Sequence, residues 1–296
     1  MRSVTRRVVR GMWDGSARTR RVVVTDRSMI YSVYVVETRD LHRSADHPEY
    51  RLAHQRHLSK APIREAVLDV GVAGGTPVDL RLLRNSLEST DRFPEVHDIT
   101  SESSPQHTPN EQDLEHGSGP GGVIGVRGFT DERDWVVDFR RDGLTFSRRS
   151  PYPSWREYSG LARPLVEEFL SITMPAQVVR LGLRYVNHFR LPDRDPRDYF
   201  VSLPSLPDSL SLSVDRLLTS TTARHSESGR SVHVMHVLLD DLAPGRIGHL
   251  LDIDVFSDNR FGPEEDQIRG TFESLRDFKN RIFFELITER NARLHE

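Results

Sequence analysis

From Leu58 onward, the sequence predicts the same order of elements twice: a strand, a short helix begun near a proline, three strands and a long helix. One copy occupies residues 58–175 and the other occupies residues 176–296. Alternating strands and amphipathic helices each bury a single face, so they need one another to form a core. The pattern therefore predicts an α+β fold. In it, two βαβββα-like halves form a curved antiparallel sheet with the long helices packed on one face.

The first half is expected to contain a strand over 63–72, a short helix begun by Thr76 and Pro77, strands over 123–130, 135–140 and 144–148, and a helix capped by Ser154. The second half is expected to contain a strand over 178–190, a short helix from Asp195, strands over 209–222, 231–239 and 246–256, and a helix opened by residues 262–266. Residues 91–122 are rich in Ser, Pro, Gly and acidic side chains and predict a flexible loop. A duplicated sheet of this kind resembles the saddle of TATA-binding-protein-like folds.

Residues 1–57 differ from the rest in charge, because they carry a net +6 while residues 58–296 carry −9. Strand-like pieces over 21–25 and 30–37 are the elements expected there. We expect an Arg-rich N-terminal extension that is disordered or that precedes the true translation start. A basic arm for nucleic acid is the alternative. Among the 41 basic residues of the chain, only Lys60 and Lys279 are lysines, and codon usage explains this bias.

The composition and motifs of the chain exclude several chemistries. The absence of cysteine excludes disulfides and cysteine nucleophiles and fits a reducing, cytoplasmic compartment. No apolar run is long enough to cross a bilayer, so no membrane partner is expected. The motifs of P-loops, serine hydrolases and zinc proteases are missing, and Gly122, Gly125 and Gly128 lack the spacing of a dinucleotide-binding loop. We therefore expect no cofactor, and the sequence favours a binding protein over an enzyme.

The strand expected over 178–190 alternates apolar and polar side chains with unusual regularity. Its apolar members are expected to pack under the helices: Val179, Leu181, Leu183, Tyr185 and Phe189. Two aspartates of a later strand share a face about 7 Å apart. If the polar sides of the strands align, the sheet has one charged face. This face holds six candidate ligand-binding residues: Arg180, Arg184, His188, Glu65, Asp252 and Asp254.

The sequence leaves three uses of this charged face open. In the first, the charged side chains form ion pairs with one another on a solvated sheet. In the second, Arg180 and Arg184 hold an anionic ligand or nucleotide. In the third, Glu65, Asp252 and Asp254 bind a metal ion, although hard cations need more oxygen ligands than these three. No catalytic residue and no metal ligand is assigned.

Four segments of the chain carry a resemblance to a known family. They are Leu58-Ser59-Lys60-Ala61-Pro62-Ile63-Arg64-Glu65-Ala66, Arg180-Leu181-Gly182-Leu183-Arg184-Tyr185-Val186-Asn187, the Leu251-Asp252-Ile253-Asp254 strand, and Leu275-Arg276 with Lys279-Asn280-Arg281-Ile282-Phe283-Phe284. In order and spacing, these segments resemble a sporadically distributed family of uncharacterised bacterial and archaeal proteins over about residues 58–294. The resemblance implies no reaction. It leaves residues 1–57 outside the match.

Together these observations favour a cytoplasmic, non-catalytic binding or accessory module. The charged sheet face would hold an unknown protein partner or an anionic small ligand, and sporadic occurrence suggests an accessory role in stress or phage defence. A metal-dependent phosphoester or nucleotide-processing enzyme that uses Glu65, Asp252 and Asp254 is the first alternative. Nucleic-acid binding by the sheet or by the basic arm is the second, and the net charge of −9 on residues 58–296 argues against it.

Overall fold

A computed structural model of the chain describes residues 19–26, 29–36, 50–75, 77–101, 122–192, 195–201, 203–204, 209, 214–239 and 247–296. The chain divides into two compact units, Met1–Arg51 and Leu52–Glu296. In the first unit, strand β1 (Thr19–Asp26) pairs antiparallel with strand β2 (Met29–Val36). Both strands were expected from the sequence. The other residues before Tyr50 lie outside the described ranges, so the tail, misplaced-start and basic-arm hypotheses stay predictions.

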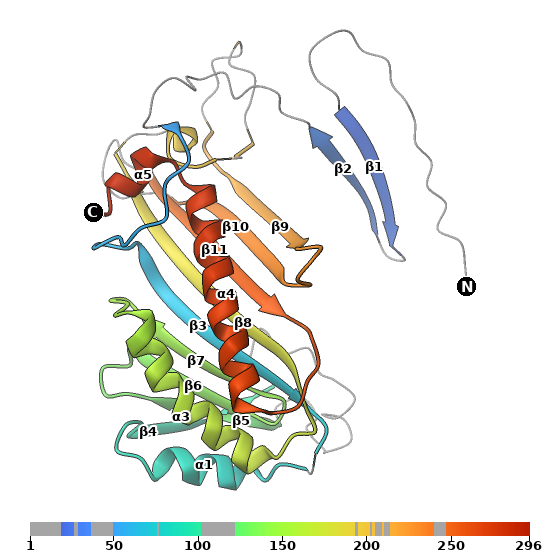
Figure 1. Cartoon of the computed structure of the whole chain (residues 1–296), viewed down its shortest axis with the longest axis vertical. Helices are drawn as coiled ribbons and strands as arrows, with labels where there is room; N and C mark the ends of the chain where they lie inside the picture. The colour runs from blue at the N-terminus through green and yellow to red at the C-terminus, as the bar shows by residue number, and fades with distance from the viewer. Residues whose placement is uncertain are drawn as a thin grey trace. The chain divides into compact units, whose positions relative to one another are not determined.

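The second unit contains a large open antiparallel sheet. Its strands are β3 (Ile63–Ala73), β4 (Glu95–Thr100), β5 (Val123–Phe129), β6 (Trp135–Arg140), β7 (Gly143–Arg149), β8 (Gln177–Leu191), β9 (Leu218–Arg224), β10 (Ser231–Leu239) and β11 (Ile247–Ser257). Their order across the sheet is β4-β5-β6-β7-β3-β8-β11-β10-β9, as Figure 1 shows. The first strand of each half pairs with the last strand of the same half, and β3 also pairs with β8 at the centre.

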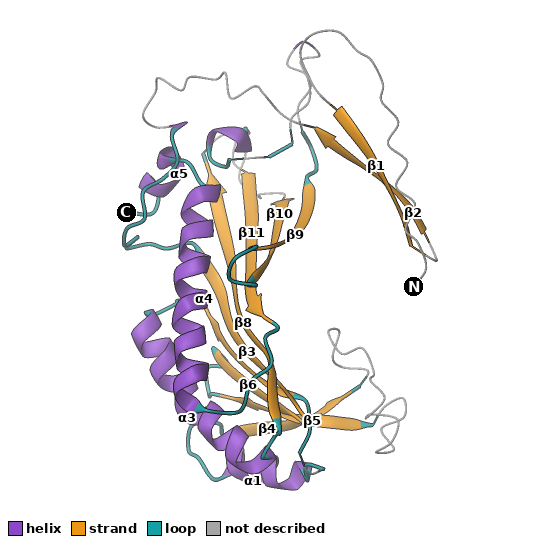
Figure 2. Cartoon of the chain, turned by 45° about the vertical axis from the view of Figure 1, so that its right-hand side comes forward, coloured by secondary structure: helices purple, strands orange, loops and turns teal. Residues whose placement is uncertain are grey.

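The helices of this unit cover one face of the sheet, as Figure 2 shows. They are α1 (Leu80–Glu88), α3 (Trp155–Thr173), α4 (Glu265–Leu286) and the short α5 (Glu289–Arg293), with a 3-10 turn at Pro196–Asp198. Ser154 caps α3, because its side chain accepts a hydrogen bond from the amide of Glu157. The expected α+β class with an antiparallel sheet is therefore confirmed. In the part of the chain that the structure describes, no helix has the length and apolar character that crossing a membrane requires.

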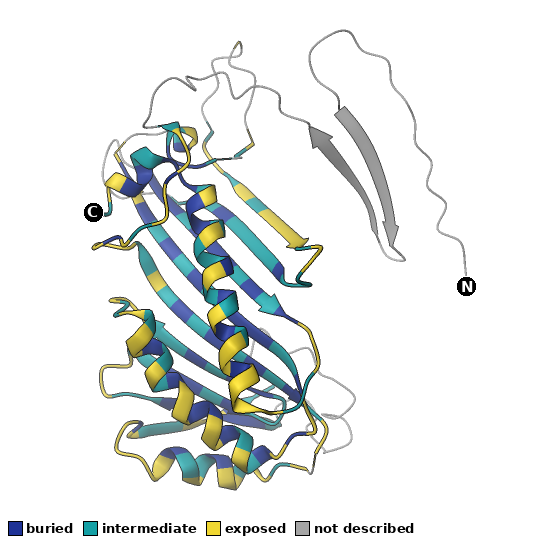
Figure 3. Cartoon of the chain, viewed as in Figure 1, coloured by how far each residue is buried: buried dark blue, intermediate teal, exposed yellow. Residues whose placement is uncertain are grey.

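The core lies between the sheet and the helices, where the central strands β3 and β8 bury alternate side chains over most of their length (Figure 3). On β3 these side chains are Ala66, Leu68, Val70 and Val72. On β8 they include Leu181, Leu183, Tyr185 and Phe189, as expected, but not Val179. A bulge between β3 and β8 pairs Val72 with Val178 and leaves Val179 without a partner in that register. Val178 instead occupies the core and exchanges two backbone hydrogen bonds with Phe261.

Several expected boundaries differ from the observed ones. The predicted loop over 91–122 contains strand β4, whose Ile99 is buried at the edge of the sheet. Helix α1 begins after Asp79, whose side chain accepts a hydrogen bond from the amide of Arg81, and the expected cap Thr76 lies outside the described residues. Strand β9 begins at Leu218 and not at residue 209.

The second unit also begins earlier than the expected boundary at Leu58. The amide of Ala53 donates a hydrogen bond to the carbonyl of Ile287, and Arg56 makes a two-point ion pair with Glu289. These contacts hold residues 52–57 against the C-terminal end of α4 and against α5.

Candidate functional site

The charged sheet face expected from the sequence lies on the side away from the helices. Arg184 on β8 donates hydrogen bonds to both carboxylate oxygens of Asp252 on β11, at 2.6 to 3.0 Å. The Asp252 side chain is only 6% exposed, so its charge depends on this partner. The hydrogen bond to Asp252 raises the pKa of the Arg184 guanidinium.

The second arginine of this face is also paired. Arg180 lies between two aspartates, with Nε 3.0 Å from Asp69 and Nη2 3.2 Å from Asp254. Its guanidinium also stacks on the ring of Phe256 at 4.1 Å from the centroid. Burial raises the pKa of the Asp254 carboxyl, and the charge of Arg180 opposes that rise. The described part of the face is therefore a set of mutually compensating ion pairs.

The two other candidate residues lie on the same face. Glu65 is half-buried on β3 opposite Val186, and the backbone amide of His188 donates to the carbonyl of Pro62. Over the described ranges, no three His, Asp or Glu side chains form a group that could hold a metal ion. Binding by Arg180, Arg184, His188, Glu65, Asp252 and Asp254 thus stays a prediction, and the metal hypothesis has no geometric support in the described residues.

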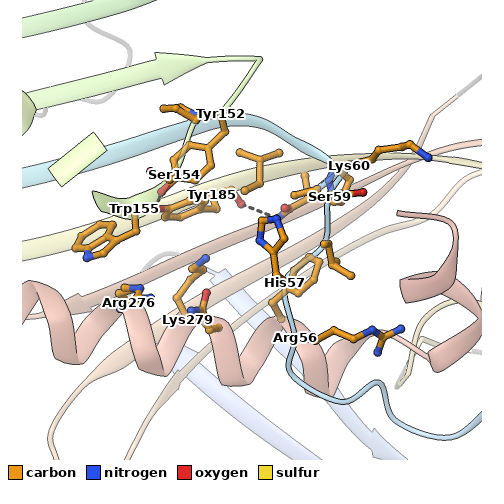
Figure 4. A pocket seen from close by; sticks show the side chains of 18 of the residues that line it. Arg56, His57, Ser59, Lys60, Tyr152, Ser154, Trp155, Tyr185, Arg276 and Lys279 are labelled. Atoms are coloured by element: carbon orange, nitrogen blue, oxygen red, sulfur yellow. Dashed lines mark hydrogen bonds between the residues drawn. The ribbon is translucent and has the colours of Figure 1, made fainter. Parts of the chain in front are cut away.

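A different site lies on the helix side of the sheet. A pocket of about 1010 Å³ opens between the start of α3, the middle of α4, strand β8 and residues 55–63. Figure 4 shows Lys279 and Arg276 entering it from α4, Tyr152 from the loop before α3, Trp155 from the first residue of α3, and His57 from the segment before β3. The indole of Trp155 donates a hydrogen bond to Glu273 at 2.7 Å and so joins α3 to α4 at one end of the pocket.

The pocket has a strong excess of positive charge. Among the described residues, five Arg or Lys line it, namely Arg56, Lys60, Arg156, Arg276 and Lys279, and one carboxylate, Glu273. Arg56 is neutralised by Glu289 and Glu296, and Arg276 pairs with Glu273 at 3.3 Å. Within the described ranges, no carboxylate pairs with Lys279 or with Arg156. The pocket therefore retains uncompensated positive charge.

Lys279 is the most unusual of these cations. Its Nζ lies 3.8 Å from the centre of the Tyr185 ring, and no described residue makes a hydrogen bond or ion pair with it. The side chain is half-buried where it lines the pocket. This burial, together with the nearby positive charge of Arg276, lowers the pKa of Lys279 to about 7.

Two tyrosines form the apolar wall beside Lys279. The hydroxyls of Tyr152 and Tyr185 lie 2.9 Å apart and share a hydrogen bond. Tyr185 is 2% exposed, and burial raises its pKa well above the usual range. Burial also raises the pKa of Tyr152 to about 12, so both rings stay neutral at physiological pH. They supply an aromatic surface and hydroxyl groups without negative charge.

A second cluster of titratable side chains lies under the other half of the sheet. His236 Nδ1 is 3.0 Å from His249 Nε2, and the ring of Phe200 stacks on His249 at 4.0 Å. Burial lowers the pKa of His236 to about 4 and that of His249 to about 3. His249 Nδ1 is buried without a hydrogen-bond partner. Both side chains are buried, so we regard the pair as part of the core.

Comparison with protein-family models, with curated proteins and with solved structures found no match. The family resemblance of the four segments therefore stays a prediction. Three of those segments nevertheless meet at the pocket: residues 58–63 form one wall, Tyr185 and Asn187 lie on its floor, and residues 276–284 of α4 form another wall.

Sequence reasoning missed this pocket because its residues come from four distant parts of the chain. One signal for it was present. The rarity of lysine singled out Lys60 and Lys279, both of which line the pocket.

Proposed function

We propose that this protein is a binding module for a small anionic ligand, which it holds in the pocket between α3 and α4. The observation that carries the proposal is the positive charge of Lys279 and Arg156, which no described carboxylate compensates, beside an aromatic wall of the pocket. A cation held away from water costs free energy unless an anion pairs with it. A bound carboxylate or phosphate would supply that anion.

The pocket is a better candidate than the charged sheet face. Arg180 and Arg184 already have carboxylate partners at hydrogen-bonding distance, so an anion would have to displace Asp69, Asp254 or Asp252. In contrast, no described carboxylate pairs with Lys279, whose ammonium lies 3.8 Å from the centre of the Tyr185 ring. The volume of about 1010 Å³ also lies near the upper end of the range usual for small-molecule sites, about 300 to 1,000 Å³.

The test is anion binding by the full chain. A panel of mono- and dicarboxylates, phosphate esters and nucleotides is screened by thermal shift, and each hit is measured by isothermal titration calorimetry. Lys279→Met is expected to weaken binding at least about tenfold, because it removes the amine whose protonated form pairs with the anion. Arg281→Ala is the matched control, since Arg281 is exposed on the same helix and does not line the pocket. Failure of every anion, or equal loss in both variants, contradicts the proposal.

The sequence-based predictions about duplication, cellular location, role and family are part of the same proposal. We propose that the two halves are duplicated versions of one βαβββα unit related to the TATA-binding-protein-like saddle. The like pairing of first and last strands within each half supports this relation. A cytoplasmic location, an accessory role in stress or phage defence and membership of the uncharacterised family stay with it as proposals. They rest on the cysteine-free composition and on the resemblance of the four segments.

A further inference from the structure

The two lysines of this chain lie in one pocket. Of 41 basic residues, only Lys60 and Lys279 are lysines, and both line the proposed ligand site. A codon bias would account for the dominance of arginine elsewhere, but not for the position of the two exceptions in one pocket. A chemical difference between the two residue types accounts for it better: arginine stays protonated in proteins, whereas lysine can lose its proton.

The two lysines differ in their surroundings. Lys60 is exposed, and its Nζ donates a hydrogen bond to the backbone oxygen of Glu296 at 2.9 Å. Lys279 projects from α4 towards the ring of Tyr185, one turn after Arg276, and no acceptor among the described residues holds its amine (Figure 4). Lys279 is therefore the amine that is free to react with a molecule in the pocket.

An amine in this setting has a specific reactivity. Burial and the charge of Arg276 lower the pKa of Lys279 to about 7, so a large fraction of the side chain is neutral near physiological pH. A desolvated lysine beside another cation is the arrangement that activates lysine as a nucleophile toward carbonyl groups. The neutral amine carries the lone pair that such an attack requires.

We propose that Lys279 forms an imine with a small carbonyl compound that also carries an anionic group, such as a 2-oxo acid, bound in this pocket. The inference rests on the proposed anion binding. In the reaction, the Nζ lone pair attacks the carbonyl carbon and gives a carbinolamine. The carbinolamine then loses the former carbonyl oxygen together with two protons as water, which leaves a C=N bond. No oxidant or reductant is consumed, so the capture is reversible.

The positive lining gives the ligand its orientation. Arg276 lies three residues before Lys279 on α4, and i, i+3 side chains share one face of a helix. Arg156 enters from the first turn of α3. Arg156 has no carboxylate partner among the described residues and is the positioning residue that would hold the anionic group while the carbonyl carbon faces the amine. Arg276, which pairs with Glu273 at 3.3 Å, adds positive charge nearby. An uncharged carbonyl compound has no such anchor, and we expect it to react more slowly.

The test traps the imine with cyanoborohydride, which reduces C=N to a stable secondary amine. The full chain is treated with pyruvate or with its neutral methyl ester, and labelled peptides are mapped by mass spectrometry. Because the chain has two lysines and one α-amino group, the assignment is unambiguous. We expect Lys279 to be labelled at least about tenfold faster than Lys60, with pyruvate preferred over the ester. The labelling rate is expected to rise as the pH increases through about 7, where the amine loses its proton.

Lys279→Arg separates this inference from the proposed function. The variant keeps the positive charge, so it is expected to bind anions while forming no adduct, and circular dichroism checks its fold. Pyridoxal 5′-phosphate serves as a second probe. Equal labelling of Lys60 and Lys279, equal rates for pyruvate and its ester, or no adduct with either probe overturns the imine. If anion binding persists in these cases, the proposed function still holds although no imine forms.

Discussion

His236 Nδ1 and His249 Nε2 lie 3.0 Å apart in the core, on the helix side of adjacent strands. Both side chains are nearly inaccessible, at 5% and 0% exposure, and burial keeps both rings neutral by lowering their pKa values to about 4 and about 3. In the unfolded chain both rings titrate near pH 6.5. The free energy of unfolding therefore depends on pH through this pair.

The first prediction concerns acid. Below about pH 6.5 the unfolded state binds protons that the folded state excludes, so the free energy of unfolding falls as pH decreases towards 4. Each histidine contributes a slope of about 1.4 kcal/mol per pH unit in that window. The double variant His236→Leu, His249→Phe is expected to show a flatter dependence in urea unfolding between pH 7 and pH 5.

His233→Gln is the control for this experiment, because His233 lies on the opposite face of the same strand and is more exposed. Its acid dependence is expected to match that of the unmodified chain. Equal slopes for the unmodified chain and the double variant would show that the buried pair is not the source.

The second prediction concerns alkaline pH and Lys279. Its pKa is lowered to about 7 in the folded chain, against about 10.5 when unfolded, so between these values the unfolded state binds one more proton. The free energy of unfolding is then expected to rise from about pH 7 to about pH 9.5. Lys279→Met removes this rise, and Lys60→Met, which removes the other lysine, keeps it. A rise that persists in Lys279→Met would place the linked proton elsewhere.

The third prediction compares two ion pairs. Arg184 and Asp252 form a bidentate pair whose carboxylate is 6% exposed, whereas Arg163 and Glu167 form an i, i+4 pair on α3 with side chains 59% and 44% exposed. Arg184→Ala leaves Asp252 unpaired and is expected to cost about 2 to 4 kcal/mol of unfolding free energy. Arg163→Ala is expected to cost less than about 0.5 kcal/mol. Chemical denaturation measures both, and similar losses would contradict the distinction.

The fourth prediction addresses divalent metals. Asp252 and Asp254 are hydrogen-bonded to Arg184 and Arg180, so their oxygens are not free to enclose a hard cation. Adding Mg²⁺ or Mn²⁺ is expected to leave the thermal midpoint unchanged, since a ligand stabilises a protein only when it binds the folded state. A metal-dependent rise that Asp252→Asn abolishes would restore the metal hypothesis.

The sequence predicted the elements that alternate strongly. Strands β3, β5 to β8, β10 and β11 and the long helices α3 and α4 were expected near their observed positions, because a buried face leaves a regular apolar pattern. Strand β4 was missed, since Glu95, His97 and Asp98 make its edge-strand sequence look like a polar loop. The bulge at Val179 was missed because it depends on backbone pairing with Phe261, which no local pattern records.

The sites were harder to predict than the strands. Arg180, Arg184, Asp252 and Asp254 were correctly placed on one face, since alternation alone determines the face of a strand residue. Predicting which arginine pairs with which aspartate would require the register of β8 with β11. Predicting the pocket would require the packing of α4 against the sheet. Predicting the His236–His249 pair would require knowing that the two residues lie diagonally opposite on neighbouring strands. Neither can be obtained from spacing along the chain.

The central β3–β8 pair also divides the protein into two complementary pieces. β3 has 11 residues and β8 has 15, and their hydrogen bonds are what join the sheet of one half to that of the other. A chain cut in the turn between Thr173 and Gln177 would give two fragments, each with one long strand edge open to pairing. The pocket would be divided as well, with Tyr152 on one fragment and Lys279 on the other. If the two fragments reassembled through the β3–β8 pair, they would rebuild the pocket. Ligand binding would then measure the association of the two fragments.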